Sequence, residues 1–311
     1  MAVTWLWAGF ILVIGVMLVL DLGIFQKKAH VMKVREAAVM VAVWWALAFA
    51  FALAVYLVYG HDKAFQFVSA YILEQSLSVD NLFVFILVFS FFGIEPENQP
   101  RILHWGILGA IAMRFVFIFA GISLLEQWHV MFYVFGAALV YTGGKMMFSN
   151  EEQMEPGKNP ALRLLHKFLP VTVGTHGHRF FTRLDGVLHA TPLFAALVVI
   201  EATDLVFAVD SIPAALGVSS DLFVVYTSNI FAVMGLRSTY FLLAGSMAEF
   251  KYLKAGVSAV LVFVGVKMMI KDLYHIPTGA SLAVIGGTLF AAIAASWLVR
   301  KRTVLTLEPR R

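Results

Sequence analysis

The chain has 311 residues, of which 61% are hydrophobic and only 14% are charged, and its mean hydropathy is +0.85. Soluble globular domains carry roughly 25% charged residues, so this composition excludes an ordinary water-soluble domain. The net charge of +4 is not gathered on a soluble module, and nucleic acid is therefore not an expected partner. The absence of cysteine excludes disulfides, thiolate metal sites and thiol redox chemistry.

Apolar runs near twenty residues follow one another along the chain, and this is the length that crosses a bilayer core as a helix. Lipid admits helices or closed barrels only, and runs that are continuous rather than alternating favour helices. We therefore expect an all-α, polytopic transmembrane helical bundle. The first run has no basic residue before it and no cleavage site after it, so we expect it to be a span. The nine expected spans cover approximately residues 4–25, 36–58, 66–92, 103–125, 129–148, 192–216, 221–247, 253–271 and 279–299.

The basic residues predict the orientation of these spans. Seventeen Lys and Arg residues fall in connections on one side, which we assign to the cytoplasm, whereas Lys63 and Lys271 alone fall on the other. The N-terminus is then outside and the C-terminus is cytoplasmic. The remaining four basic residues lie within spans: Arg114, Lys145, Arg237 and Lys267.

Three features recur in the same order in the two halves of the chain. Glu74 is followed by five residues, Asp80 and Asn81, and Asp204 is followed by five residues, Asp210 and Ser211. The next span in each half has one arginine before an Ala-Gly pair, and the one after it has a Gly-x-Lys-Met-Met motif, at 143–147 and 265–269. Because each unit has three spans, the second copy must enter the membrane from the opposite side. This predicts two inverted three-helix repeats, as in many secondary transporters.

The repeats divide the chain into five parts. Residues 1–65 hold the first two spans, 66–148 the first repeat, 149–191 a linker, 192–271 the second repeat, and 272–311 the last span with a basic tail. The linker is proline-rich and is expected on the cytoplasmic side, with a short helix near 161–169. About forty residues cannot build an enzymatic core alone, so we do not expect an enzyme.

Carboxylates lie inside the apolar runs, where each costs roughly 2.5 to 3.5 kcal/mol. They are either structural partners of the two arginines or an ion site. Five central acids exceed two arginines by three charges, or by one if both lysines are counted, and this excess favours a divalent cation. The predicted metal ligands are Glu74, Asp80, Asn81, Glu201, Asp204, Asp210 and Ser211, with Arg114 and Arg237 as charge partners and Asp21, Asn229, Lys145 and Lys267 as accessory residues.

Ideal helices would not aim the paired acids at one ion, since Glu74 and Asp80 diverge by about 120° at 3.6 residues per turn. Pro213 follows Asp210 and removes a backbone donor. We therefore expect irregular helix near Asp80 and Asp210. Hard oxygen ligands suit Mn, Mg or Ca, and composition does not choose among them. His176 and His178 in the linker are interpreted as a solvated loop rather than a metal site.

At these residues the chain resembles the TerC family of bacterial membrane proteins, most closely its Alx branch. The resemblance covers nearly the whole chain. The matching stretches are residues 74–83, 201–214, 227–229 through 236–237, and 267–269 with 274–277.

The resemblance implies kinship with LysE-type exporters, location in the bacterial inner membrane, and Mn²⁺ export through the paired acidic motifs, with no tightly bound cofactor. An older interpretation of the Alx branch is a membrane redox modulator, and the family name refers to tellurium resistance. Two alternatives to metal export remain. The first is a stress-resistance protein that acts through a protein partner, which the sequence does not identify. The second is an anion or amino-acid exporter that uses Arg114 and Arg237.

Overall fold

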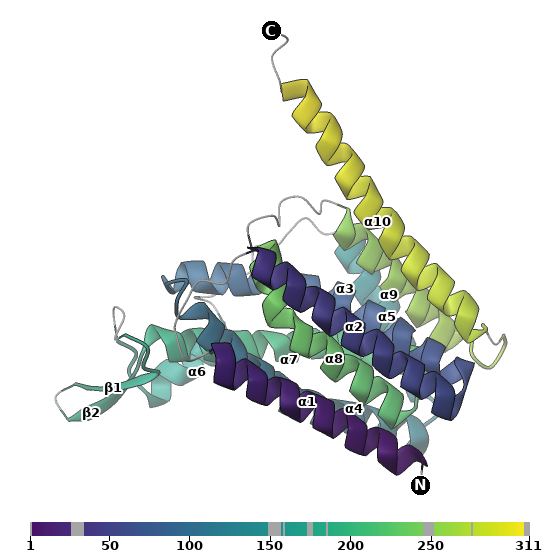
Figure 1. Ribbon diagram of the computed structural model, residues 1–311, viewed down its shortest axis with the longest axis horizontal. Helices are drawn as coiled ribbons and strands as arrows, with labels where there is room; N and C mark the ends of the chain where they lie inside the picture. The colour runs from purple at the N-terminus through teal and green to yellow at the C-terminus, as the bar shows by residue number, and fades with distance from the viewer. Residues whose placement is uncertain are drawn as a thin grey trace.

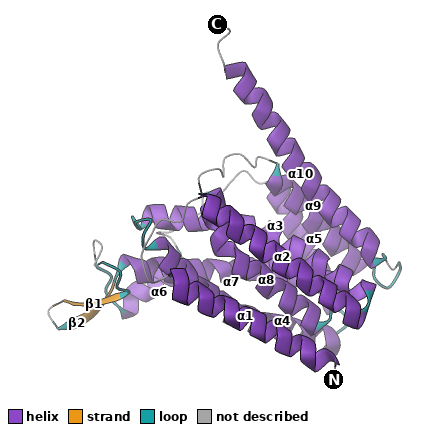
Figure 2. Ribbon diagram, viewed as in Figure 1, coloured by secondary structure: helices purple, strands orange, loops and turns teal. Residues whose placement is uncertain are grey.

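The structure is a computed structural model that describes residues 2–25, 34–148, 157, 159–172, 177–184, 186–244, 252–274 and 276–307. These residues form a bundle of helices with one small hairpin at its end (Figures 1 and 2). In chain order the elements are α1 (Ala2–Phe25), α2 (Val34–Tyr59), α3 (His61–Phe91), α4 (Gln99–Gln127), α5 (Met131–Phe148), α6 (Pro160–Phe168), β1 (Phe181–Leu184), β2 (Val187–Ala190), α7 (Pro192–Val218), α8 (Leu222–Leu243), α9 (Leu253–Met269) and α10 (Thr278–Leu307).

The long helices of the described residues overlap the nine ranges expected from the sequence. Four of them are apolar enough, by length and composition, to cross a membrane: Val34–Tyr59, Gln99–Gln127, Pro192–Val218 and Thr278–Leu298. The prediction of an all-α helical membrane protein is therefore confirmed. The full number of nine spans stays a prediction.

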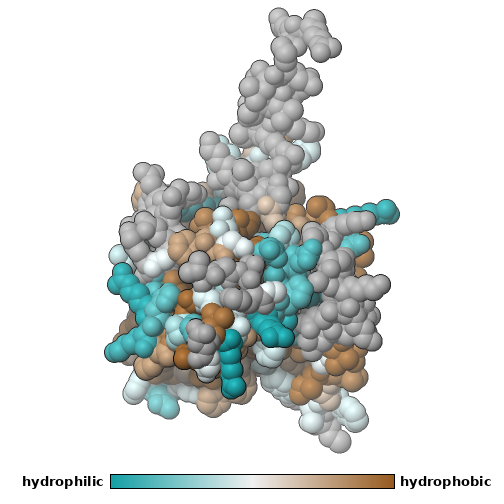
Figure 3. Space-filling view, turned by 90° about the vertical axis from the view of Figure 1, so that its left-hand side faces the viewer, coloured by the Kyte–Doolittle hydropathy of each residue, from teal (hydrophilic) through white to brown (hydrophobic). Residues whose placement is uncertain are grey.

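The sides of the bundle expose large apolar side chains. Trp5 on α1, Leu57 on α2 and Phe290 on α10 are 76%, 75% and 74% exposed. Apolar surface of this extent is unfavourable in water but is ordinary against lipid. Figure 3 looks onto the end that carries α6 and the hairpin, where hydrophilic residues gather beside hydrophobic surface. The distribution is that of a bundle with apolar sides and a polar end.

The centre of the bundle consists of α3, α4, α7 and α8. Helix α3 packs against α7 and α8, and α4 packs against the same two helices. Helix α2 covers α3 and α8, α1 contacts α2 and α8, and α10 covers α3 and α9. The three helices expected outside the repeats, α1, α2 and α10, therefore lie around the central helices rather than among them (Figure 1).

Helices α5 and α9 approach each other closely because small residues line their contact. A Cβ atom at Gly136 or Gly265 would overlap the backbone of the other glycine, and one at Gly143 would overlap the Ser258 carbonyl. The Ser258 hydroxyl donates to the carbonyl of Gly143. Residue numbers rise along α5 as they fall along α9, so these two helices are antiparallel.

This contact is reciprocal in the way that inverted units require. Gly136 precedes the first glycine of its Gly-x-Lys-Met-Met motif by seven residues, and Ser258 precedes the corresponding Gly265 by seven. Gly136 of the first unit therefore corresponds to Ser258 of the second, and Gly143 corresponds to Gly265. If each residue is replaced by its counterpart, the Gly136–Gly265 contact becomes the Gly143–Ser258 contact. The packing of α3 on α8 and of α4 on α7 is related by the same exchange. The assignment of 66–148 and 192–271 as repeats stays a prediction, which this packing supports.

The linker contains the expected short helix and also a hairpin that was not expected. Helix α6 lies within one residue of the predicted range, and β1 pairs antiparallel with β2, with Phe181 opposite Ala190 (Figure 2). The dipeptide Asp185-Gly186 is a hairpin signal, and Gly186 has a φ of 80°, which favours glycine. The all-α expectation is thus correct for the bundle and incomplete for the linker.

The α5–α9 contact predicts a position-specific effect of adding one methyl group. Gly265→Ala should lower the melting temperature of the purified protein in detergent, because overpacking against backbone costs about 1–3 kcal/mol. Gly144→Ala is the matched control, since nothing lies within 4 Å of a Cβ there and alanine favours helix by up to about 1 kcal/mol. Equal melting temperatures for the two variants would contradict the close approach.

Candidate functional site

The polar side chains predicted from the sequence lie on the four central helices. Helix α3 carries Glu74 and Asn81, and α7 carries Asp204 and Asp210. Helices α4 and α8 add Arg114 and Asn229. Segments that are more than one hundred residues apart in the chain are thus brought together.

Arg114 links three other helices at the centre of this site. Its Nη1 donates to Glu74 Oε1 and, over 2.9 Å, to Asn229 Oδ1. Its Nη2 donates to Asp204 Oδ1 over 3.4 Å. Asn81 Nδ2 also donates to that Asp204 oxygen, over 3.1 Å. The guanidinium and Glu74 are each only 1% exposed, so this is a buried ionic network.

Several oxygen atoms in the network and beside it keep free acceptor capacity. Within the described residues, Glu74 Oε2, Asn81 Oδ1, Asp204 Oδ2 and Ser211 Oγ are buried and accept no hydrogen bond. Buried polar atoms normally have partners, so an unpaired set calls for an explanation such as a bound ion or water. Carboxylate, amide and hydroxyl oxygens are ligands that hard divalent cations prefer.

Asp210 faces a different neighbour from Asp204. Its Oδ1 accepts a hydrogen bond of 3.0 Å from Thr142 of α5. A cavity of about 80 Å³ lies beside it, lined by polar side chains of both predicted repeats. The polar lining residues are Glu74, Asn81, Arg114, Thr142, Asp210 and Ser211.

The expectation of irregular helix near the acids is wrong. Helix α3 is continuous through Asp80, and α7 is continuous through Asp210 and Pro213. Unwinding is unnecessary because α7 presents Asp204 towards Arg114 and Asp210 towards Thr142, on different sides of one regular helix. Neighbouring helices and small local adjustments also make an internal proline tolerable in membrane helices.

Glu201 lies one turn before Asp204 and packs directly on α4. A Cβ atom at Gly109 would overlap its carboxylate, so a larger residue there would displace the end of the Glu201 side chain. Glu201, Asp204 and Arg237 line a small cavity of about 20 Å³. Arg237 is 3% exposed. The second arginine therefore lines the same cavity as two acids of α7, and its role as their charge partner stays a prediction.

The remaining predicted residues either lie elsewhere or have side chains that the structure does not describe. The side chains of Asp80 and Asp21 lie outside the described part of the structure, as does His176. Lys267 lines a separate cavity at the end of the bundle, and His178 Nδ1 lies 2.6 Å from Asn98 Oδ1. Among the described residues, no group of three or more His, Asp or Glu side chains could hold a metal without rearrangement. Arg114 occupies the space between Glu74 and Asp204.

Sequence reasoning missed two residues that shape the site, Thr142 and Gly109. Thr142 left a signal, because it is the one Ser or Thr residue in the apolar run 131–148 and lies just before the Gly143-Gly144 pair. Gly109 left none, since many glycines occur in these helices and only the packing of Glu201 distinguishes this one.

The buried network predicts a large loss of stability when its cation is removed. Arg114→Gln should lower the free energy of unfolding by about 3–5 kcal/mol, because it leaves buried carboxylates without a counter-charge. Adding Glu74→Gln to that variant should recover part of the loss, since it removes one of these charges. Thermal or denaturant unfolding in detergent measures both.

The Lys63–Asp221 ion pair supplies the comparison. Its atoms are 2.7 Å apart, but its side chains are 34% and 27% exposed. Lys63→Gln should therefore cost only about 0–1 kcal/mol. An Arg114→Gln variant no less stable than Lys63→Gln would rule out a structural role for the network.

Comparison with known proteins agrees with this architecture. The chain is 48% identical over 303 residues to an uncharacterised membrane protein of Myxococcus xanthus, covering 97% of this chain and 95% of that one. It is 43% identical over 293 residues to Alx of Escherichia coli, named as a candidate membrane-bound redox modulator, with 91% of each chain covered. No solved structure matches the chain. The sequence model of the TerC family of integral membrane proteins matches residues 59–304, and the chain belongs to this family.

Proposed function

We propose that the protein is a secondary transporter that exports a divalent metal cation, most simply Mn²⁺, from the cytoplasm. The observation that carries the proposal is the cavity of about 80 Å³ between the acidic segments. Glu74 and Asn81 of α3 face it together with Asp210 and Ser211 of α7. Two carboxylates and two neutral oxygen donors form a hard ligand set.

The free oxygens around Arg114 support the same proposal. Glu74 Oε2 and Asn81 Oδ1 are buried acceptors without donors in the described residues, and both belong to residues that line the cavity. A cation seated there would satisfy them. The preference for Mn²⁺ over Mg²⁺ and Ca²⁺ rests on the TerC resemblance, because the ligand types suit all three.

Arg114 distinguishes the two states of the proposed transport cycle, one with the metal ion bound and one without it. In the structure, the guanidinium forms ion pairs with both Glu74 and Asp204. A metal ion that takes Glu74 as a ligand competes with Arg114 for the same carboxylate. Ion binding therefore favours an arrangement of α3, α4 and α7 in which the contact between Arg114 and Glu74 is weaker. A ligand shifts the equilibrium between two arrangements by the difference in its affinity for them.

The proposed transporter lies in the bacterial inner membrane, with its N-terminus outside and its C-terminus in the cytoplasm. Rocking of one three-helix unit against the other would expose the cavity to each side in turn. In this proposal the movement would take place at the contacts between the two units, of which α5–α9, α3–α8 and α4–α7 are the most extensive. The simplest ion to be coupled to metal export is the proton, taken up by the same carboxylates.

Reconstitution tests metal transport directly. Purified protein in liposomes that contain a Mn-sensitive dye should give Mn²⁺ influx when the ion is added outside. Asp210→Asn should lower the initial rate by about tenfold or more, as is typical when a group that supports a metal site is changed.

Asp272→Asn is the control for this experiment. Asp272 lies at the end of the bundle, 44% exposed, where it accepts a hydrogen bond of 2.8 Å from Tyr133. Its replacement should leave the rate unchanged. Absence of flux in the unaltered protein, or equal rates for both variants, would refute the proposal.

A second candidate is a stress-resistance protein that acts through a partner without moving metal. The name of the Escherichia coli relative favours it, and so does the linker, whose amphipathic helix α6 exposes Leu164 and Phe168. In that case, replacing residues 151–185 with a flexible linker abolishes resistance to stress in cells, whereas Asp210→Asn has no effect. The metal transporter gives the opposite pattern.

The third candidate from the sequence, an anion or amino-acid exporter, is less favoured. Arg114 would have to bind the substrate, but its guanidinium already donates to Glu74, Asn229 and Asp204. An anionic substrate would also meet those carboxylates.

A further inference from the structure

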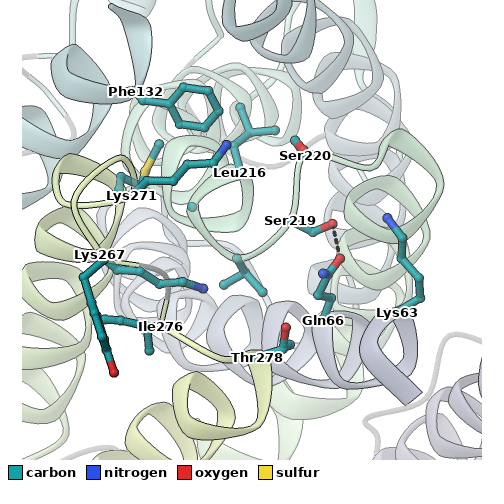
Figure 4. Close-up of a pocket in the computed structure, with 14 residues that line it drawn as sticks. Lys63, Gln66, Phe132, Leu216, Ser219, Ser220, Lys267, Lys271, Ile276 and Thr278 are labelled. Atoms are coloured by element: carbon teal, nitrogen blue, oxygen red, sulfur yellow. Dashed lines mark hydrogen bonds between the residues drawn. The ribbon is translucent and has the colours of Figure 1, made fainter. Parts of the chain in front are cut away.

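A second polar cavity lies at the end of the bundle where α5 and α10 begin and where α7 and α9 end (Figure 4). Its volume is about 190 Å³, room for several water molecules at about 30 Å³ each. Side chains from α3, α5, α7, α9 and α10 and from two connections form its walls. We call it the end cavity, and the residues that matter here are Lys63, Gln66, Phe132, Lys267, Lys271 and Thr278.

The charge of the end cavity is the reverse of that at the central site. Three lysines line it, and the described lining residues include no carboxylate. Lys63 is neutralised from outside the lining, since its Nζ lies 2.7 Å from Asp221. Lys271 lies over the ring of Phe132, 3.8 Å from the ring centre, which orients its ammonium group without cancelling the charge.

Lys267 is the member whose charge is unmatched. It is half-buried, and among the described residues it makes no ion pair or hydrogen bond. Figure 4 shows its side chain extending into the end cavity. Lys271 lies four residues further along the chain, so two ammonium groups stand near each other without an acid between them.

Neutral donors complete the lining. The Ser219 hydroxyl donates to Gln66 Oε1 over 2.6 Å, which fixes the amide and leaves its NH₂ group as the free end (Figure 4). Ser220 and Thr278 add hydroxyl groups to the same walls. Ammonium, amide and hydroxyl donors around a partly open cavity are groups that bind phosphate and similar oxyanions.

The carbonyl end of α7 offers a simpler role for one lysine, because cations are favoured near a helix C-terminus. That role needs one charge, whereas the end cavity has two ammonium groups beyond the Lys63–Asp221 pair. This simpler role also does not account for the fixed Gln66 amide or for the cavity itself.

We propose that the end cavity binds an oxyanion of the phosphate type, with Lys267 as its main contact and Lys271 as the second charge. The group is either free phosphate or the phosphate of a lipid headgroup. A bound oxyanion would join α3 of the first unit to α9 of the second, since Gln66 and Lys267 face it from those helices. Occupancy therefore stabilises the arrangement of the two units seen in the structure.

Chemical labelling of the unaltered protein tests the site without a mutation. Protein in an uncharged detergent is treated with an amine acetylating reagent at constant ionic strength, with and without inorganic phosphate. Mass spectrometry then measures acetylation of Lys267 relative to Lys254, which lies at the other end of α9. Phosphate should slow acetylation of Lys267 and leave Lys254 unchanged.

A binding measurement gives the magnitude. Calorimetric titration with inorganic phosphate should give an apparent Kd that rises by at least about tenfold in Lys267→Gln, because a charge-assisted hydrogen bond is lost. Lys254→Gln is the matched control and should bind as the unaltered protein does.

Nanodiscs distinguish the two sources of the group. In phosphate-free buffer, protection of Lys267 by anionic phospholipid but not by a purely zwitterionic bilayer identifies a lipid headgroup, and protection by added phosphate alone identifies the free ion. If neither slows the acetylation of Lys267, the oxyanion site is disproved, whatever the outcome of the metal-flux experiment.

Discussion

The buried guanidinium of Arg114 is the interaction on which the centre of the protein depends. It comes from α4 and joins α3, α7 and α8 through Glu74, Asp204 and Asn229. Carboxylates in an apolar bundle are tolerated only if their negative charge is compensated. A positively charged side chain beside them compensates it most directly. The four helices therefore meet where their polar residues can pair, and the remaining helices cover them.

The network neutralises some acids and leaves others available. Arg114 uses one oxygen of Glu74 and one of Asp204, while the second oxygen of each is buried without a donor in the described residues. Asp210 stands apart, held by Thr142 at the edge of the cavity that it shares with Glu74. The unpaired oxygens beside this stable ion-pair network are the feature on which the proposed binding of a cation rests.

The two larger cavities described in the bundle have opposite chemistry. The central one presents carboxylate, amide and hydroxyl oxygens, whereas the one at the end presents ammonium groups and neutral donors. Helices α3 and α7 line both cavities, so a structural change at one cavity acts on helices that also line the other. This separation also explains why Lys267 does not belong to the charge balance of the central acids.

The sequence by itself determined the helical membrane class, the approximate position of each long helix and the charged residues at the centre, because lipid imposes length, apolarity and a cost on every charge. It did not reveal the neutral Thr142 beside them. Tertiary structure alone decided which acid meets which cation. Glu74 and Arg114 are forty residues apart, and no periodicity could reveal that Arg114 also reaches Asn229. The expected unwinding near Asp210 was wrong for the same reason: a regular helix can serve two neighbours, and only their positions show it.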